Sequence, residues 1–448
     1  MKTIKSLRKY LKLNPFNIEN SENISGLRLF HTGILLLAAA PSIAFLLLII
    51  SSIIGSLNRK ENYFVDKYNL PFLSASILMF INCIIINIRA DFINNQNPSL
   101  AWIGLLNWIP FFWFFWIFQI YLKNEILRIK AAKYLLIGSL PVLFSGLSQY
   151  FLGWYGPYEI LNKLITWYQR PLSEGGGVTG LFNNYNYYGA WLSILLALAV
   201  GLYLIESENK IFKTITLILI CSFVYMIILS TSRNALLAVL ITLILLFPIK
   251  SKSIKFLLLS AFAGICVLII NLIPIFSSNI QNKIFTFLPS SILEKTALDS
   301  LDTFNSFPRI ELWLKAIKLI RSNLLIGYGG GSFSDLYDIS DGKFEGMQHT
   351  HNIFLEIAFN YGLPCSILII GTMLFILIKN INTYFLKRNK ELLKNNYEFL
   401  DFNKAWITSF LIFISLHMFD ITYFDGRISI LAWILLAGMR QIIKEKIY

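Results

Sequence analysis

The sequence predicts an all-α polytopic membrane protein with about twelve transmembrane helices and one large outer loop. Three observations support this fold class. Of the 448 residues, 56% are hydrophobic and only 14% are charged, which excludes an ordinary soluble domain. Apolar runs long enough to cross about 30 Å of hydrocarbon recur along the chain. Basic residues gather in alternate connecting loops, as expected for the cytoplasmic side of a membrane.

The first apolar run, about 26–57, is too long for one helix and is interrupted by Pro41. We expect a short helical hairpin that turns at Pro41, because only two crossings here bring the basic loops to one face. Each leg of about 15 residues reaches about 22 Å, which is short for a crossing. The other crossings are expected near 69–88, 100–121, 131–152, 186–205, 211–229, 234–249, 254–275, 352–379, 404–423 and 428–443.

This layout places both chain ends and most of the 39 Lys and Arg residues in the cytoplasm. The net charge of +14 then reflects membrane orientation, and no nucleic-acid partner is expected. The predicted divisions are helices 1 to 9 at 1–275, a large periplasmic loop at 276–350, and the last three helices with a cytoplasmic C-terminus at 351–448. A cleaved signal peptide is the alternative interpretation of the N-terminus.

Polar residues of the outer face gather in three segments, of which two precede the large loop. The segment 153–185 carries Arg170 and leads into the asparagine-rich stretch Gly180–Gly189. The short turn Ser230–Asn234 contains Arg233, which opposes the charge bias of the outer face. Unpaired N–H groups at such a helix start favour binding of an anion, so we interpret Arg233 as part of a phosphate-binding site. A side chain that merely snorkels to the interface is the alternative.

The large loop is the third segment, and it predicts an amphipathic helix. Pro308 suits the first turn, which places Arg309 at the positive end of the helix and again favours an anion. Pairing of Arg309 with Asp299 or Asp302 is the alternative. Glu311 and Lys315 are expected on the polar face. The apolar stripe is expected to comprise Ile310, Trp313, Leu314, Ile317 and Ile320.

Two histidines follow at the end of the loop. His349 and His351 precede Asn352 and an apolar run. Imidazole beside a cationic pocket is the right type of group for proton transfer near neutral pH. A metal site and a merely interfacial histidine are the alternatives. The cluster Gly327–Gly331 lacks the βαβ context of a dinucleotide site, so we interpret it as a turn that allows close backbone approach.

The order of these motifs resembles a known family. Gly-Leu-Phe-x-Asn-x-Asn at 180–186, Ser-Arg at 232–233, Pro-Arg-x-x-x-Trp at 308–313 and His-x-His-Asn at 349–352 follow in sequence. Nine residues and then Gly362 come after Asn352. Together they resemble the O-antigen ligase and polymerase superfamily of integral-membrane glycosyltransferases. The resemblance covers roughly 170–430. Two positions depart from the pattern, Tyr185 in the asparagine-rich stretch and Cys365 after the histidine motif.

The resemblance implies an O-antigen ligase-like enzyme of the bacterial inner membrane, with its site facing the periplasm. It would transfer a glycan from undecaprenyl diphosphate to an acceptor sugar of a glycolipid, lipid A-core, without cofactor or metal. Arg233 and Arg309 match the arginines that hold the donor diphosphate, and His351 matches the catalytic histidine. Weaker candidates for donor or acceptor contacts are Arg170, Asn186, His349 and Asn352.

Two other functions remain open at this stage. A polymerase of the same superfamily would extend a lipid-linked repeat instead of transferring it to lipid A-core. A polysaccharide transporter is the alternative from another class, and it would carry polar residues near the middle of the bilayer and repeated broken helices. The polar residues here concentrate at one face, which favours the enzyme.

Overall fold

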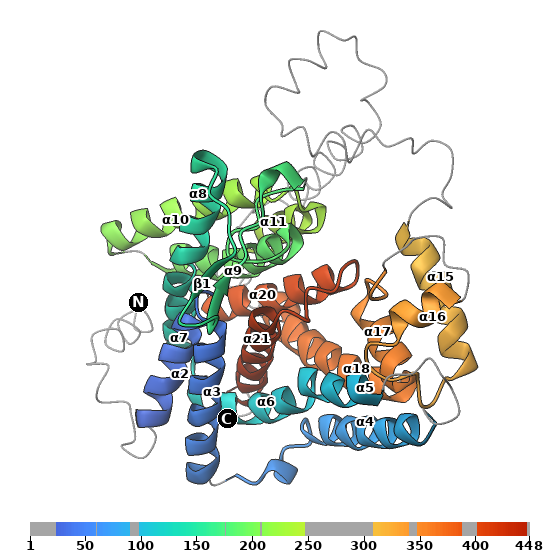
Figure 1. Ribbon diagram of the computed structural model, residues 1–448. Coiled ribbons are helices and arrows are strands. Elements are labelled where there is room, and N and C mark those ends of the chain that lie inside the picture. Colours follow the sequence, from blue (N-terminus) through green and yellow to red (C-terminus); the bar gives the residue numbers. More distant parts are fainter. Residues whose placement is uncertain are drawn as a thin grey trace.

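The computed structural model is built almost entirely of helices (Figure 1). It describes residues 24–59, 61–89, 98–174, 176–206, 208–246, 308–339, 347–387 and 401–445. The predicted crossing at 254–275 and the first part of the predicted loop, 276–307, lie outside the described residues. The all-α membrane fold class is therefore confirmed in its coarse form, whereas the count of twelve crossings stays a prediction.

Eight stretches of the described chain are long and apolar enough to cross a membrane. Two of them, Pro98–Tyr121 and Glu125–Leu152, each consist of two successive helices. Two further apolar helices, α2 and α11, are shorter. The helices are α2 (Ile24–Leu36), α3 (Pro41–Asn58), α4 (Leu70–Arg89), α5 (Pro98–Gly104), α6 (Ile109–Tyr121), α7 (Glu125–Gly138), α8 (Leu140–Leu152), α9 (Tyr185–Ile205), α10 (Lys210–Leu229), α11 (Arg233–Leu246), α15 (Pro308–Ser322), α16 (Phe333–Ile339), α17 (Ile353–Tyr361), α18 (Leu363–Ile381), α20 (Phe402–His417) and α21 (Gly426–Lys444).

Proline positions explain two of the helix boundaries. The first apolar run forms two packed helices, α2 and α3, and Pro41 is the first residue of the second. Proline is tolerated there because the first helical N–H has no partner within the helix. The predicted crossing 352–379 is one helix in the sequence interpretation, but the structure divides it into α17 and α18 at Gly362. Pro364 then stands in the first turn of α18.

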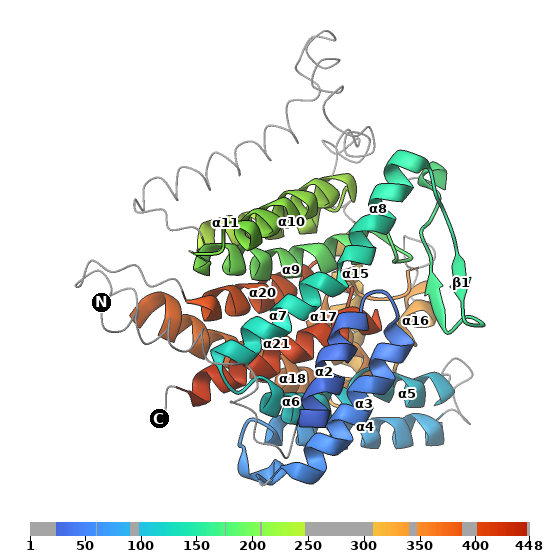
Figure 2. The same ribbon diagram turned by 90° about the vertical axis from the view of Figure 1, so that its left-hand side faces the viewer.

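The most deeply buried helices are α9 and α21, which most other elements surround (Figures 1 and 2). Helix α9 packs against α10, α11 and α20, and α21 packs against α6, α18 and α20. Both helices are apolar on nearly every side, which is the pattern of a helix enclosed by others. On the other side of the bundle, α15 packs against α17 (Figure 1).

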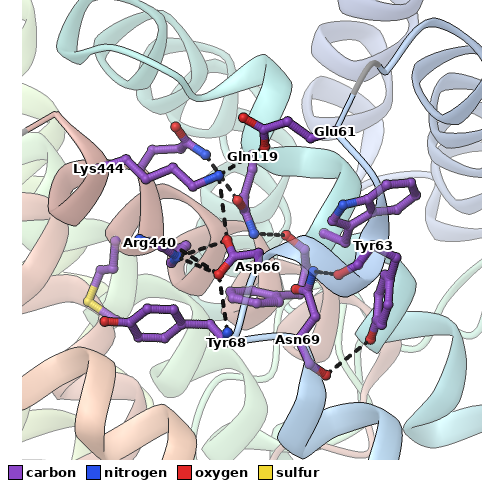
Figure 3. Close-up of polar contacts among 12 residues, drawn as sticks. Glu61, Tyr63, Asp66, Tyr68, Asn69, Gln119, Arg440 and Lys444 are labelled. Atoms are coloured by element: carbon purple, nitrogen blue, oxygen red, sulfur yellow. Dashed lines mark hydrogen bonds and ion pairs between the residues drawn. The ribbon is translucent and has the colours of Figure 1, made fainter. Parts of the chain in front are cut away.

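An ionic cluster ties the loop before α4 to the end of α21 (Figure 3). Asp66 receives two hydrogen bonds from Arg440 Nε and Nη2, at 3.0 and 3.1 Å, and both side chains are buried. Lys444 lies 3.1 Å from Glu61 and 3.5 Å from Asp66. The cluster therefore joins two segments that are far apart in sequence. It lies at the end of the bundle opposite the starts of α9, α11 and α17.

The described strands form a single two-stranded hairpin between α8 and α9. Strand β1 (Tyr158–Ile160) pairs antiparallel with β2 (Ile165–Trp167). The indole Nε1 of Trp167 donates to the carbonyl of Ala39 in the α2–α3 turn, at 2.8 Å. The hairpin is thereby attached to the turn between α2 and α3 (Figure 2).

Candidate functional site

The candidate site is built around the chain segment that enters α17. His351 has a φ of 54°, which is the left-handed region that costs about 1–3 kcal/mol for a residue with a side chain. Asn352 caps the helix by accepting hydrogen bonds from the N–H groups of Phe354 and Leu355. Its Nδ2 also donates to the carbonyl of Met418, at 3.1 Å. Asn352 therefore holds the histidine segment against the loop that follows α20.

A buried carboxylate supports this segment from the other side. Glu356 accepts the N–H of Thr350 at 2.9 Å and the amide of Asn360 at 3.0 Å. The hydroxyl of Thr350 donates to the carbonyl of Asn352 at 3.0 Å. These bonds lie on both sides of His351 and fix the backbone conformation that its positive φ requires.

His351 pairs with an aspartate that sequence reasoning missed. Its Nδ1 lies 3.0 Å from Asp420 Oδ1, and the same oxygen accepts the N–H of Ile421 at 2.8 Å. The side chain of Asp420 is only 9% exposed, whereas that of His351 is 26% exposed. Burial alone would raise the pKa of Asp420, but the hydrogen bond from His351 and the nearby positive groups lower it overall. The carboxylate therefore stays ionised, and the partly exposed ring of His351 uses Nδ1 for this contact.

Arg309 lies at the start of α15 and reaches the same site. Burial lowers its pKa, the charge of Asp420 raises it, and the charge of Arg233 lowers it again. Tyr185, the first residue of α9, is the fourth group in this electrostatic neighbourhood. Sequence segments separated by 42 to 76 residues thus bring two arginines and the His351–Asp420 pair together. The guanidinium of Arg309 nevertheless keeps its positive charge, since arginine stays protonated in proteins.

Arg233 enters the site from a turn that the preceding loop supports. Thr231 has a φ of 56°, and Ser230 Oγ donates to the carbonyl of Ile227. The N–H of Val178 donates to the carbonyl of Leu229 at 3.0 Å, so the loop before α9 packs on this turn. Arg233 itself is exposed, at the first position of α11. The predicted helix start is therefore present as the start of α11, and the guanidinium side chain of Arg233 is accessible to solvent.

His349 lies next to His351, with ring centroids 4.3 Å apart. Burial lowers its pKa to about 4, and the neighbouring His351 contributes to the lowering. His349 is therefore neutral at neutral pH and is not a second cation beside His351. Among the residues that the structure describes, no cluster of three potential ligands surrounds the two histidines.

Several predicted residues occupy other positions. Arg170 is exposed, and its backbone N–H and carbonyl bond to Thr179 and Gln149 in the loop before α9. Asn186 is in the first turn of α9, where its N–H donates to Asn184 Oδ1. No described contact brings either side chain to Arg309 or His351. They stay predictions as substrate contacts.

The glycine cluster belongs to the far end of α17. The N–H groups of Tyr328 and Gly329 donate to the carbonyls of Phe359 and Asn360, both at 2.8 Å. Gly327 has a φ of 78°, and a Cβ there would overlap the backbone of Phe359 and Gly362. The cluster is a close backbone contact, as the sequence indicates, and the length of α17 separates it from His351 by about 13 Å.

The amphipathic helix is present as α15, but its buried face differs from the predicted stripe. Leu312, Ala316 and Ile320 are buried against α16 and α17, while Leu314 and Ile317 are exposed. Glu311 is also nearly buried, because it accepts a hydrogen bond from the hydroxyl of Tyr337. The prediction that Glu311 faces solvent was wrong. Its partner lies on α16, which the apolar spacing of α15 alone does not reveal.

The comparison with protein families bears directly on this site. Residues 215–370 match the O-antigen ligase family. The chain carries an O-antigen ligase family domain. The match includes Arg233, Arg309 and the segment from His349 to Gly362, and it ends before Asp420. A comparison with curated proteins finds no match. The family assignment implies a membrane enzyme of the glycosyltransferase type.

Proposed function

We propose that the protein transfers a glycan from undecaprenyl diphosphate to a sugar hydroxyl of an acceptor glycolipid, as an O-antigen ligase. The observation that carries this proposal is the gathering of Arg233 and Arg309 around the His351–Asp420 pair. Two cations beside a proton acceptor suit a reaction whose leaving group is a diphosphate and whose nucleophile is a hydroxyl. The acceptor of this proposal is lipid A-core.

The arginines act on the leaving group. The anomeric carbon loses its bond to the diphosphate oxygen, which gains negative charge as that bond breaks. Guanidinium groups already in place stabilise this charge more in the transition state than in the bound donor. Arginine suits the task because its planar fork matches phosphate oxygens and it stays charged. Burial of Arg309 strengthens the interaction, since nearby charges act through a lower dielectric.

His351 acts on the acceptor. Hydrogen bonding of Nδ1 to Asp420 favours the tautomer with its proton on Nδ1, which leaves Nε2 as the base. As the new carbon–oxygen bond forms, the acceptor hydroxyl gives its proton to Nε2. Asp420 stabilises the resulting imidazolium, and the products are the glycosylated acceptor and undecaprenyl diphosphate. The imidazolium of His351 then releases the proton to bulk solvent.

The charge pattern supports a periplasmic position for the site. The basic segment 123–133, between α6 and α7, and Lys379 in the last turn of α18 lie at the end of the bundle opposite the starts of α9, α11 and α17. Positive loops remain in the cytoplasm during insertion. The site then lies at the outer face of the inner membrane, where a lipid-linked glycan and an acceptor glycolipid can both reach it.

Deletion of the gene distinguishes this proposal from the polymerase of the same superfamily. Loss of a ligase leaves long polymer on the lipid carrier and none on lipid A-core. Loss of a polymerase instead leaves lipid A-core that bears a single repeat. Gel separation of the lipopolysaccharide from the deletion strain, complemented with the intact gene as a control, shows which pattern occurs.

A further inference from the structure

The β1–β2 hairpin has a polar face and an apolar face. Side chains two residues apart in a strand share a face, and directly paired residues lie side by side. Glu159 pairs with Thr166, so these two polar residues occupy one face. Lys163 Nζ lies 3.4 Å from Glu159 on the same polar side. The other face carries the pairs Tyr158–Trp167 and Ile160–Ile165.

Most of the apolar residues of the hairpin are exposed. Tyr158 and Ile160 are exposed, and Leu161 at the tip is 64% exposed. Leu164, also at the tip, is exposed as well. An isolated two-stranded hairpin is marginally stable in water, and a contiguous exposed apolar patch usually marks a contact surface. The exposed apolar residues of the hairpin therefore indicate that this surface contacts an apolar partner.

The root of the hairpin is rigidly attached to the bundle. Trp167 donates from its indole to Ala39, and the N–H of Gly156 donates to the carbonyl of Gln169 at 2.8 Å. Trp167 is half-buried against the apolar core. The root of the apolar face thus packs on the bundle through Trp167, while the part of that face nearer the tip, with Ile160 and Leu161, stays exposed.

The helix that leads into the hairpin belongs to a candidate membrane span and ends in exposed apolar side chains. Trp154 turns back along α8 and packs edge-on against Phe144, with ring centroids 6.2 Å apart. These rings are 46% and 58% exposed, although Phe144 lies well inside the apolar span Glu125–Leu152. Phe151 and Leu152 extend the same exposed surface to the end of α8. Trp and Tyr favour the boundary between hydrocarbon and water, where one end of the ring is apolar and the other is wet.

We propose that the β1–β2 hairpin inserts into the lipid leaflet on the side of the membrane where α8 ends and α9 begins. Its apolar face and tip lie at the boundary between headgroups and acyl chains, and Glu159 and Lys163 face water. The ligand of this surface is phospholipid, because the hairpin begins shortly after the exposed apolar end of α8, which belongs to a candidate membrane span. Insertion anchors the loop that leads from the hairpin to Tyr185 at the candidate site. The inference depends only on a membrane location and not on the glycan reaction.

Spin labels on the two faces of the hairpin test this proposal. Single cysteines at Ile160, Leu161, Glu159 and Thr166 are labelled in the full chain, after replacement of its native cysteines, and reconstituted in phosphatidylethanolamine–phosphatidylglycerol vesicles. Each label is then exposed to oxygen, which concentrates in lipid, and to a water-soluble nickel chelate. The Glu159 and Thr166 variants are the matched controls for the same hairpin.

Insertion predicts a ratio of oxygen to nickel collisions several-fold higher at Ile160 and Leu161 than at Glu159 and Thr166. Equal nickel access on both faces would overturn the proposal, because the apolar face would then lie in water. Protection of the apolar face from both reagents would also overturn it, because protein would then cover that face. Size-exclusion profiles and thermal unfolding of each labelled variant show that the bundle remains folded.

Discussion

At the scale of single residues, the contact between His351 Nδ1 and Asp420 Oδ1 determines which ring nitrogen can accept a proton. Asp420→Asn keeps an oxygen near this position and removes the charge. We expect kcat of glycan transfer to fall by about 10- to 100-fold, because the imidazolium formed in the reaction loses its counter-ion. The KM for the donor should change much less. Steady-state kinetics of the purified variant measure both quantities.

Asp338→Asn is the control for this change, since Asp338 is an exposed carboxylate on α16. It should retain the kcat of the unmodified protein. An Asp420→Asn variant that is as active as this control would remove Asp420 from the account.

His349 makes the folded protein sensitive to acid. Its pKa of about 4 in the folded state lies below the ordinary value of 6.5, so the unfolded chain binds the proton more readily. The stabilising effect of a neutral His349 is complete above pH 6.5 and is lost as the pH falls toward 4. The loss amounts to at most about 3 kcal/mol. Asp420 adds little in this window because its carboxylate is ionised throughout.

We therefore expect His349→Gln to reduce the fall in thermal stability between pH 6.5 and pH 4. Unfolding of the detergent-solubilised proteins, followed by intrinsic fluorescence, measures the difference at each pH. At pH 7.5 protonation of His349 should contribute little to any difference in unfolding midpoint between the two proteins. Identical pH dependence of the two unfolding midpoints would show that His349 is not held neutral by burial.

The sequence predicts the cations of the site better than its carboxylate. Arg233 and Arg309 stand out because each lies at an outer helix start, and the structure places them in one electrostatic neighbourhood. Asp420 lies 69 positions from His351, in the turn after α20. The two residues meet because the start of α17 contacts the turn after α20, and the hydrophobic periodicity of the sequence does not predict that packing. A carboxylate without a nearby cation in an outer turn is the signal that could have identified it.

At the scale of elements, the start of α17 positions His351. Asn352→Ala removes the helix cap and the bond to Met418, and loss of such a cap costs about 1 kcal/mol. We expect a small fall in thermal stability and a much larger fall in kcat, because the segment with positive φ loses its attachment. The two quantities are measured on the same preparation.

Asn209→Ala is the matched control for this prediction. Asn209 caps α10 by accepting the N–H of Phe212 at 2.9 Å, at the opposite end of the bundle from His351. The control should lose similar stability and keep its activity. Equal activity in the two variants would show that the start of α17 does not position the histidine.

The cluster in Figure 3 predicts a stability change without an effect on the site. Asp66→Asn leaves Arg440 buried without its counter-ion, and breaking a buried pair in this way costs about 3–5 kcal/mol. The double variant Asp66→Asn with Arg440→Met removes both charges and should regain most of that loss. Thermal unfolding of the single and double variants tests the pair. A double variant that is as unstable as Asp66→Asn would contradict it.

Element boundaries follow from sequence where a residue dictates backbone geometry. Pro41 marks the start of α3, as the sequence predicts. Gly362 divides the predicted crossing 352–379 because its φ of 87° ends α17, and a Cβ there would overlap the carbonyl of Leu325. Hydropathy does not register this break, since the residues on both sides are apolar. The buried face of α15 likewise depends on α16 and α17, which lie against it.

At the scale of the whole molecule, composition and charge predict the membrane class and the shared location of the motifs. The helical architecture with eight long apolar spans among the described residues agrees with that class. The family match over 215–370 agrees with the motifs that carry the resemblance. Contacts between distant turns, such as those among α9, α15 and the turn after α20, required the structure because no single segment encodes them.

The central claim is that His351 and Arg309 perform glycan transfer. The most direct measurement is transfer from an undecaprenyl diphosphate-linked glycan by purified protein in liposomes, for His351→Ala, Arg309→Ala and the control Arg321→Ala. Arg321 is an exposed arginine near the other end of α15. We predict that the first two variants insert normally and lose at least about 100-fold in rate, while Arg321→Ala stays active. Transfer at the control rate by His351→Ala and Arg309→Ala would contradict the account.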